Sequence, residues 1–168
     1  MSRKIADLSL EGDGLRFVAS AGSGHQIVLD DGTGDAGMRP AELVPVALAG
    51  CTAMDVISIL RKKRQPVTRY EVHAEGEQRD APPPALFTRI DVTHIVEGGP
   101  ELDVEAVRRS IELSAMKYCS VGATLATGIA ELHHRYVVRR PGLPEETGEV
   151  LVEGPFAKHA LPEALAAR

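Results

Sequence analysis

The chain has 168 residues, of which 43% are hydrophobic and 26% are charged, and its formal net charge at pH 7 is -5. This length and composition are typical of one folded domain with at most a short extension. We expect no nucleic-acid partner, because the one strong basic run, residues 61–64, is short and the chain as a whole is acidic. The first residues lack the apolar segment of a secretory signal, and we therefore expect a cytoplasmic protein.

The first half of the chain predicts hairpins followed by a long apolar helix. Short alternating segments between glycine-rich turns indicate antiparallel strands within residues 1–35. Residues 43–60 are apolar almost throughout, which predicts a central buried helix that ends before Pro66. We do not interpret it as a membrane span, because Pro45, Gly50 and Asp55 interrupt it.

The second half predicts strands and a second helix. Residues 67–77 and 87–96 alternate and should pair as a meander, with His73 and His94 at its surface or rim. The three- and four-residue spacing of apolar residues predicts an amphipathic helix over 103–117, then a brief helix at 122–127 and a last strand at 129–138. Residues 141–168 are expected to form an extension that packs loosely or on a partner.

The two cysteines, Cys51 and Cys119, are the residues on which the function depends. Their separation excludes a CxxC motif and a compact zinc module, so they are either inert core thiols or a reactive pair that the fold brings together. We expect no metal, because the neighbouring residues His133 and His134 of a strand point to opposite faces and cannot easily share an ion with the cysteines. No nucleotide-binding loop or serine-hydrolase elbow is recognisable in the sequence.

Two segments resemble the OsmC/Ohr family of thiol proteins. Residues 40–56, PAELVPVALAGCTAMDV, resemble the helix that bears the first cysteine, and residues 117–121, KYCSV, resemble the turn that bears the second. The resemblance covers roughly residues 10–138 and implies an α+β fold of antiparallel strands with two long helices, assembled as an intertwined homodimer. It thereby implies an OsmC-like domain at residues 1–140 and an extension of unknown role at 141–168.

The resemblance implies that the protein reduces organic hydroperoxides to alcohols. Cys51 would attack the peroxide and Cys119 would resolve the resulting sulfenic acid as a disulfide. A lipoyl group or another external dithiol would then reduce the disulfide, and no bound cofactor is expected.

In this family an arginine held by a glutamate activates the first cysteine. The candidates here are Arg39, Arg16 and Glu42. The family glutamate would align with Ala41, one residue before Glu42, and Ser120 and Pro45 stand where many relatives carry proline and leucine.

Two alternatives stay open at this level. An OsmC-like dimer could bind a hydrophobic ligand in an apolar cleft, with little or no peroxidase activity. Alternatively, the acidic residues of the tail could dock to a partner, and a truncation ending at Arg140 would separate that role from catalysis. These acidic residues are Glu145, Glu146, Glu149 and Glu153.

Overall fold

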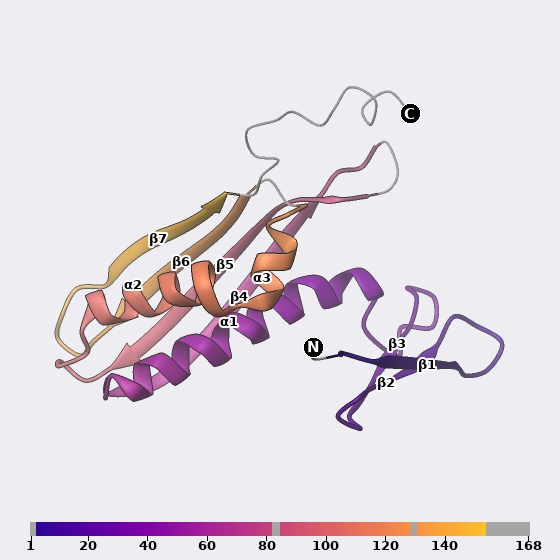
Figure 1. Ribbon diagram of the computed structural model, residues 1–168, viewed down its shortest axis with the longest axis horizontal. Helices are drawn as coiled ribbons and strands as arrows, with labels where there is room; N and C mark the ends of the chain where they lie inside the picture. Colours follow the sequence, from indigo (N-terminus) through magenta and orange to yellow (C-terminus); the bar gives the residue numbers. More distant parts are fainter. Residues whose placement is uncertain (1–2, 82–84, 129–130, 154–168) are drawn as a thin grey trace. The chain divides into compact units, whose positions relative to one another are not determined.

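The computed structural model describes residues 3–81, 85–128 and 131–153, and the chain divides into two compact units after Val44 (Figure 1). The first unit contains an antiparallel sheet in the order β1-β2-β3, which confirms the predicted hairpins. Its strands are β1 Ala6–Leu10, β2 Phe17–Ala21 and β3 Gln26–Leu29, and the 3-10 turn η1, Pro40–Glu42, follows.

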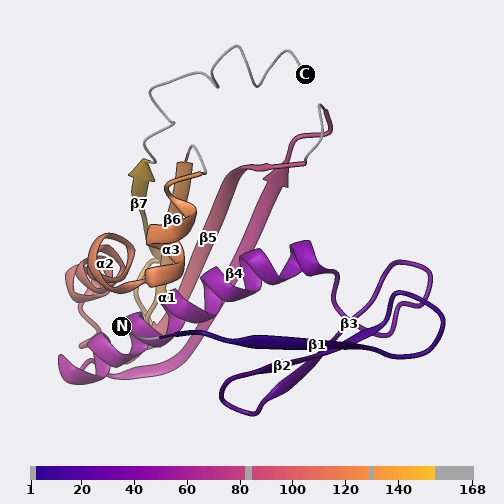
Figure 2. The same cartoon turned by 45° about the vertical axis from the view of Figure 1, so that its right-hand side comes forward.

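The second unit is a four-stranded sheet with helices on one face (Figure 2). Its strands lie in the order β4-β5-β6-β7 and comprise β4 Val67–Gln78, β5 Phe87–Gly98, β6 Glu131–Arg139 and β7 Glu146–Glu153. Its helices are α1 Leu43–Lys62, α2 Val104–Leu113, the π turn η2 Ser114–Tyr118, and α3 Ser120–Leu125. These helices agree with the predicted positions, except that α3 begins directly after Cys119.

The sheet is mixed, and this corrects the expectation of antiparallel strands throughout. β4 and β5 pair antiparallel as the predicted meander, but β5 and β6 run parallel. A parallel connection needs a crossover, and here α2, η2 and α3 provide it. The crossover therefore places Cys119, which lies between η2 and α3, on the helical side of the sheet.

The core of this unit lies between the sheet and the helices α1 and α2. Alternate residues of β5 are buried, as expected for a strand with one face against helices. Asp103 caps the start of α2, because its side chain accepts the backbone N–H of Glu105. The buried cluster consists of Val56, Leu60, Val96, Leu102, Val107, Ile111, Ala115, Tyr136, Val138 and Val150.

Helix α1 is buried along one stripe rather than all round. The stripe repeats every four residues at Leu48, Thr52, Val56 and Leu60, whereas Met54 is 74% exposed. The expectation of a fully buried helix is therefore wrong within this chain. The segment Pro40–Lys62 is long and apolar enough to cross a membrane, but the core helices of soluble proteins also meet this criterion. Because one side of α1 is buried in the chain, we interpret it as a core helix.

His94 is buried, which contradicts its expected position at the surface or rim. It has no solvent exposure, whereas His73 is exposed as expected. His94 shares the core-facing alternation of β5 with Val92 and Val96, and side chains two residues apart on a strand face the same side. The strand pattern, rather than the polarity of the residue, sets its position.

Strand β7 corrects the expectation that the tail packs loosely. Glu146–Glu153 pairs antiparallel with β6 along eight residues, from Glu131↔Glu153 to Val138↔Glu146, and Val150 joins the core. A division of the chain at residue 140 would remove one strand from this sheet. The rest of the expected extension, residues 154–168, lies outside the described residues.

Candidate thiol site

Helix α1 presents Cys51 and Asp55 one turn apart on the same face. Residues four apart on an α-helix are neighbours along its surface, so both side chains point in one direction. Cys119 approaches from the crossover, where its extended backbone ends η2 and caps the first turn of α3. Its Sγ accepts the backbone N–H of Gly122 at 3.2 Å, which fixes the direction of the thiol.

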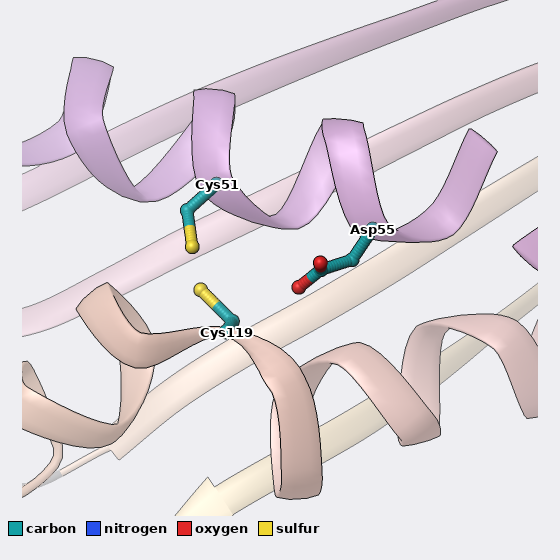
Figure 3. A group of neighbouring side chains, drawn as sticks. All are labelled: Cys51, Asp55 and Cys119. Atoms are coloured by element: carbon teal, nitrogen blue, oxygen red, sulfur yellow. The ribbon is translucent and has the colours of Figure 1, made fainter. Parts of the chain in front are cut away.

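The structure brings the two predicted cysteines together. Their Sγ atoms and a carboxylate oxygen of Asp55 all lie within 4.8 Å of one another (Figure 3). Both cysteines are free thiols, and they differ in access, because Cys51 is half-buried and Cys119 is 3% exposed. This adjacency is what a reactive pair requires, and the choice between inert core thiols and a reactive pair stays a prediction.

Asp55 is a further residue of the site, and it was not among the residues predicted from the sequence. Its Oδ2 accepts a hydrogen bond from Ser114 Oγ at 3.1 Å, and Ser114 Oγ lies 3.0 Å from Thr52 Oγ1. Because the Ser114 hydroxyl has one proton and donates it to Asp55, the Thr52 hydroxyl donates to Ser114. The spacing Cys51-x-x-x-Asp55 could have indicated this residue, whereas Ser114 and Thr52 are far apart in the sequence.

The environment of Cys119 keeps its thiol protonated. Burial raises the pKa of Cys119 to about 12, and the hydrogen bond with Cys51 and the nearby Asp55 charge act in the same direction, while the Gly122 N–H opposes them. A protonated Cys119 can donate to the sulfur of Cys51. The half-exposed Cys51 is therefore the thiol that faces both solvent and a hydrogen-bond donor.

The proposed activating residues belong to the first unit. Glu42 accepts the backbone N–H of Arg39 at 2.8 Å, but the guanidinium of Arg39 binds Asp35 at 2.7 Å rather than Glu42. Arg16 forms an ion pair with Glu11 at 3.5 Å. The expected arginine–glutamate pair thus exists only through a backbone contact, and the activating role of these residues stays a prediction.

Comparisons with known proteins agree with this architecture. The family model of OsmC-like proteins matches residues 32–146. Protein YhfA of Escherichia coli (strain K12) is 43% identical over 126 residues, which are 75% of this chain and 92% of YhfA. The chain therefore belongs to the family of OsmC-like proteins, as the two cysteine motifs predicted.

Solved structures share the fold at lower identity. A hypothetical protein from Aquifex aeolicus VF5 has a TM-score of 0.73 and 27% identity, covering 83% of this chain and 98% of its own. An organic hydroperoxide resistance protein from Elizabethkingia anophelis has a TM-score of 0.57 and 12% identity, covering 83% of this chain and 97% of its own. At 12% identity the second comparison shows a common fold alone.

Proposed function

We propose that this protein is a thiol peroxidase that reduces organic hydroperoxides to alcohols. The observation that carries the proposal is the adjacent pair of free thiols with unequal exposure, of which Cys51 is half-buried and Cys119 is buried. A peroxidase of this kind needs one accessible nucleophile and one protected resolving thiol within reach. A protein named for organic hydroperoxide resistance shares the fold of this OsmC-like chain, and this likeness is consistent with the same substrate class.

The reaction proceeds in three steps. The Cys51 thiolate attacks the O–O bond of the hydroperoxide, which yields the alcohol after proton uptake and leaves Cys51 as a sulfenic acid. The Cys119 thiol then attacks the Cys51 sulfur, forming the disulfide and releasing water. An external dithiol, such as a lipoyl group, takes over the disulfide by exchange and restores both thiols.

We further propose that the protein acts as a homodimer in the cytoplasm. Apolar side chains on α1 and beside Cys119 are exposed in this chain, notably Val46 at 51%, Met54 at 74% and Met116 at 67%. Contiguous exposed apolar patches are typical of a surface that another chain covers, and we expect these side chains to belong to such a patch. A reducing compartment would supply the dithiol and keep Cys51 and Cys119 as thiols between turnovers.

The test is consumption of cumene hydroperoxide by the purified protein with dihydrolipoamide as reductant, compared with hydrogen peroxide. We expect Cys51→Ser to reduce turnover to the background rate. Cys119→Ser should consume about one equivalent of peroxide and then stop, leaving a sulfenic acid on Cys51 that dimedone labels. Ser58→Ala, an exposed position on the same helix, serves as the control and should keep full activity.

Turnover that survives Cys51→Ser would overturn this assignment. If the parent protein is folded and reduced but consumes no peroxide, the ligand-binding alternative gains support. One observation already favours that alternative: of the groups in the described part of the chain that act most strongly on Cys119, none is a cation. A neighbouring cation favours the thiolate form of a cysteine, and none of these strongest-acting groups supplies one for Cys119.

The second alternative, docking through an acidic tail, has less support. Glu145 and Glu146 form ion pairs with Arg139 and Arg140, and Glu149 lies 3.2 Å from Arg135. These carboxylates are thus engaged by basic residues of β6 and the turn after it. A truncation ending at Arg140 would also remove β7 from the sheet, so it would test folding rather than docking.

A further inference from the structure

The three side chains at the thiol site form a donor set for a metal ion. In the part of the chain that the structure describes, Cys51, Asp55 and Cys119 are the one group of histidine, cysteine or acidic residues whose potential ligand atoms gather in this way. All three point into the space between α1 and the crossover (Figure 3). This set contains Asp55 in place of His133 and His134, which we did not expect to share a metal ion with the cysteines.

The donors are held in place by their own hydrogen-bond partners. Ser114 Oγ donates to Asp55 at 3.1 Å, and the Gly122 N–H donates to Cys119 Sγ at 3.2 Å. In metal sites such outer partners orient the ligands and strengthen binding. Here they direct a carboxylate and a sulfur toward Cys51.

The chemistry of the donors selects a borderline divalent ion. Thiolate sulfur and carboxylate oxygen together suit zinc, whereas magnesium and calcium prefer oxygen alone. Tetrahedral zinc with bonds of about 2.3 Å to sulfur and about 2.0 Å to oxygen needs its donors about 3.5 to 3.8 Å apart. Donors within 4.8 Å of one another therefore need to approach by at most about 1.0 Å between the two sulfurs and about 1.3 Å between a sulfur and the oxygen.

We propose that the reduced protein binds one zinc ion through Cys51 Sγ, Cys119 Sγ and an Asp55 carboxylate oxygen, with the fourth position open to water. Binding releases the protons of the thiols that were protonated and changes no oxidation state. The site requires reduced thiols and does not rest on peroxidase activity. Because a disulfide draws the two sulfurs to about 2.05 Å, zinc binding and disulfide formation exclude each other.

The experiment uses Co²⁺ as a spectroscopic probe for zinc in the reduced full-length protein, prepared free of metal. We expect one equivalent of Co²⁺ to produce intense visible bands of a four-coordinate ion and a near-ultraviolet thiolate charge-transfer band, both of which Zn²⁺ abolishes. Asp55→Asn should weaken Co²⁺ binding by about tenfold or more, because a charged ligand becomes a poorer, neutral donor. Glu75→Gln, at an exposed position on β4, is the control and should bind as the parent does.

A second measurement uses the unaltered chain and so does not depend on the folding of a variant. Oxidation of the cysteines to the disulfide should abolish the Co²⁺ spectrum, and reduction should restore it. Absence of the charge-transfer band in the reduced, folded parent would overturn the proposal, and unchanged binding by Asp55→Asn would remove Asp55 from the site. Peroxide turnover, assayed separately with a chelator, can then succeed or fail independently of the metal result.

Discussion

At the scale of single residues, a row of polar side chains, made of the half-buried Tyr70 and the buried His94 and His134, crosses the helix-covered face of the sheet. Tyr70 Oη lies 2.7 Å from His94 Nδ1, and His94 Nε2 lies 3.4 Å from His134 Nδ1. Burial raises the pKa of Tyr70 above its ordinary value, so its hydroxyl keeps the proton and can donate to His94. His94 can then donate from Nε2 to His134, which satisfies both ring nitrogens of His94 in the neutral form.

The buried histidines should make stability depend on pH. Burial lowers the pKa of His94 to about 3 and that of His134 to about 4, whereas both would titrate near 6.5 when unfolded. Below pH ~6.5 the unfolded chain therefore binds more protons, and the free energy of unfolding falls as the pH falls toward the folded-state values. The slope should approach about 1.4 kcal/mol per pH unit for each histidine.

Urea denaturation between pH 7 and pH 5 measures this slope while most carboxylates remain ionised. His94→Gln should flatten the slope, even though it lowers stability by disturbing the packing and the hydrogen bond between residue 94 and Tyr70. His73→Gln, at an exposed position on β4, should leave the slope unchanged. A slope in His94→Gln equal to that of the parent would show that His94 does not titrate as a buried group.

At the scale of elements, β7 is the strand that completes the sheet. Gly148 stands opposite Tyr136 of β6, and the Tyr136 side chain, which is 7% exposed, lies over the glycine. A Cβ on residue 148 would lie 2.8 Å from Tyr136 Cε1 and closer still to the hydroxyl end of the ring. The absence of a side chain at Gly148 therefore lets Tyr136 enter the core.

Gly148→Ala should destabilise the protein by about 1 to 3 kcal/mol, because the buried ring must move to make room. The measurement is the denaturant midpoint followed by circular dichroism. Gly14→Ala is a matched control, since a Cβ at residue 14 would have nothing within 4 Å and its backbone has no positive φ. If Gly148→Ala were as stable as the parent, β7 would not pack against Tyr136 as the structure places it.

At the scale of the whole molecule, α1 has more apolar surface than the described residues bury. Leu48 and Val56 are fully buried against the sheet and crossover side, but Met54 between them projects outward at 74% exposure. A helix with apolar residues on both faces normally contacts partners on both faces. A second copy of the chain is the partner that the proposed dimer provides.

Met54→Glu should shift the protein from dimer to monomer, because an ionised carboxylate would have to be desolvated at the interface. Light scattering coupled to size exclusion at micromolar concentrations measures the change in mass. His73→Glu introduces the same charge at an exposed position on β4 and should leave the dimer intact. A parent protein that is monomeric at every concentration tested would contradict the homodimer directly.

The sequence by itself predicted the elements that depend on local periodicity. The helices α1 and α2 and the strands β4 and β5 could be predicted because hydrophobic periodicity, and residues such as Pro66 that end a helix, determine local structure over a few residues. The two cysteine motifs also identified the family, because each motif lies within one continuous segment. The burial of His94 could have been predicted too, since it follows the alternation of Val92 and Val96.

Only the tertiary structure decided which distant segments meet. The parallel pairing of β5 with β6 and the addition of β7 depend on long-range backbone pairing, which local composition does not specify. The thiol site also depends on contacts between segments that are distant in the sequence. Cys51 and Asp55 share a helix face through local geometry, but their contact with Cys119 and Ser114 exists because the crossover packs beside α1.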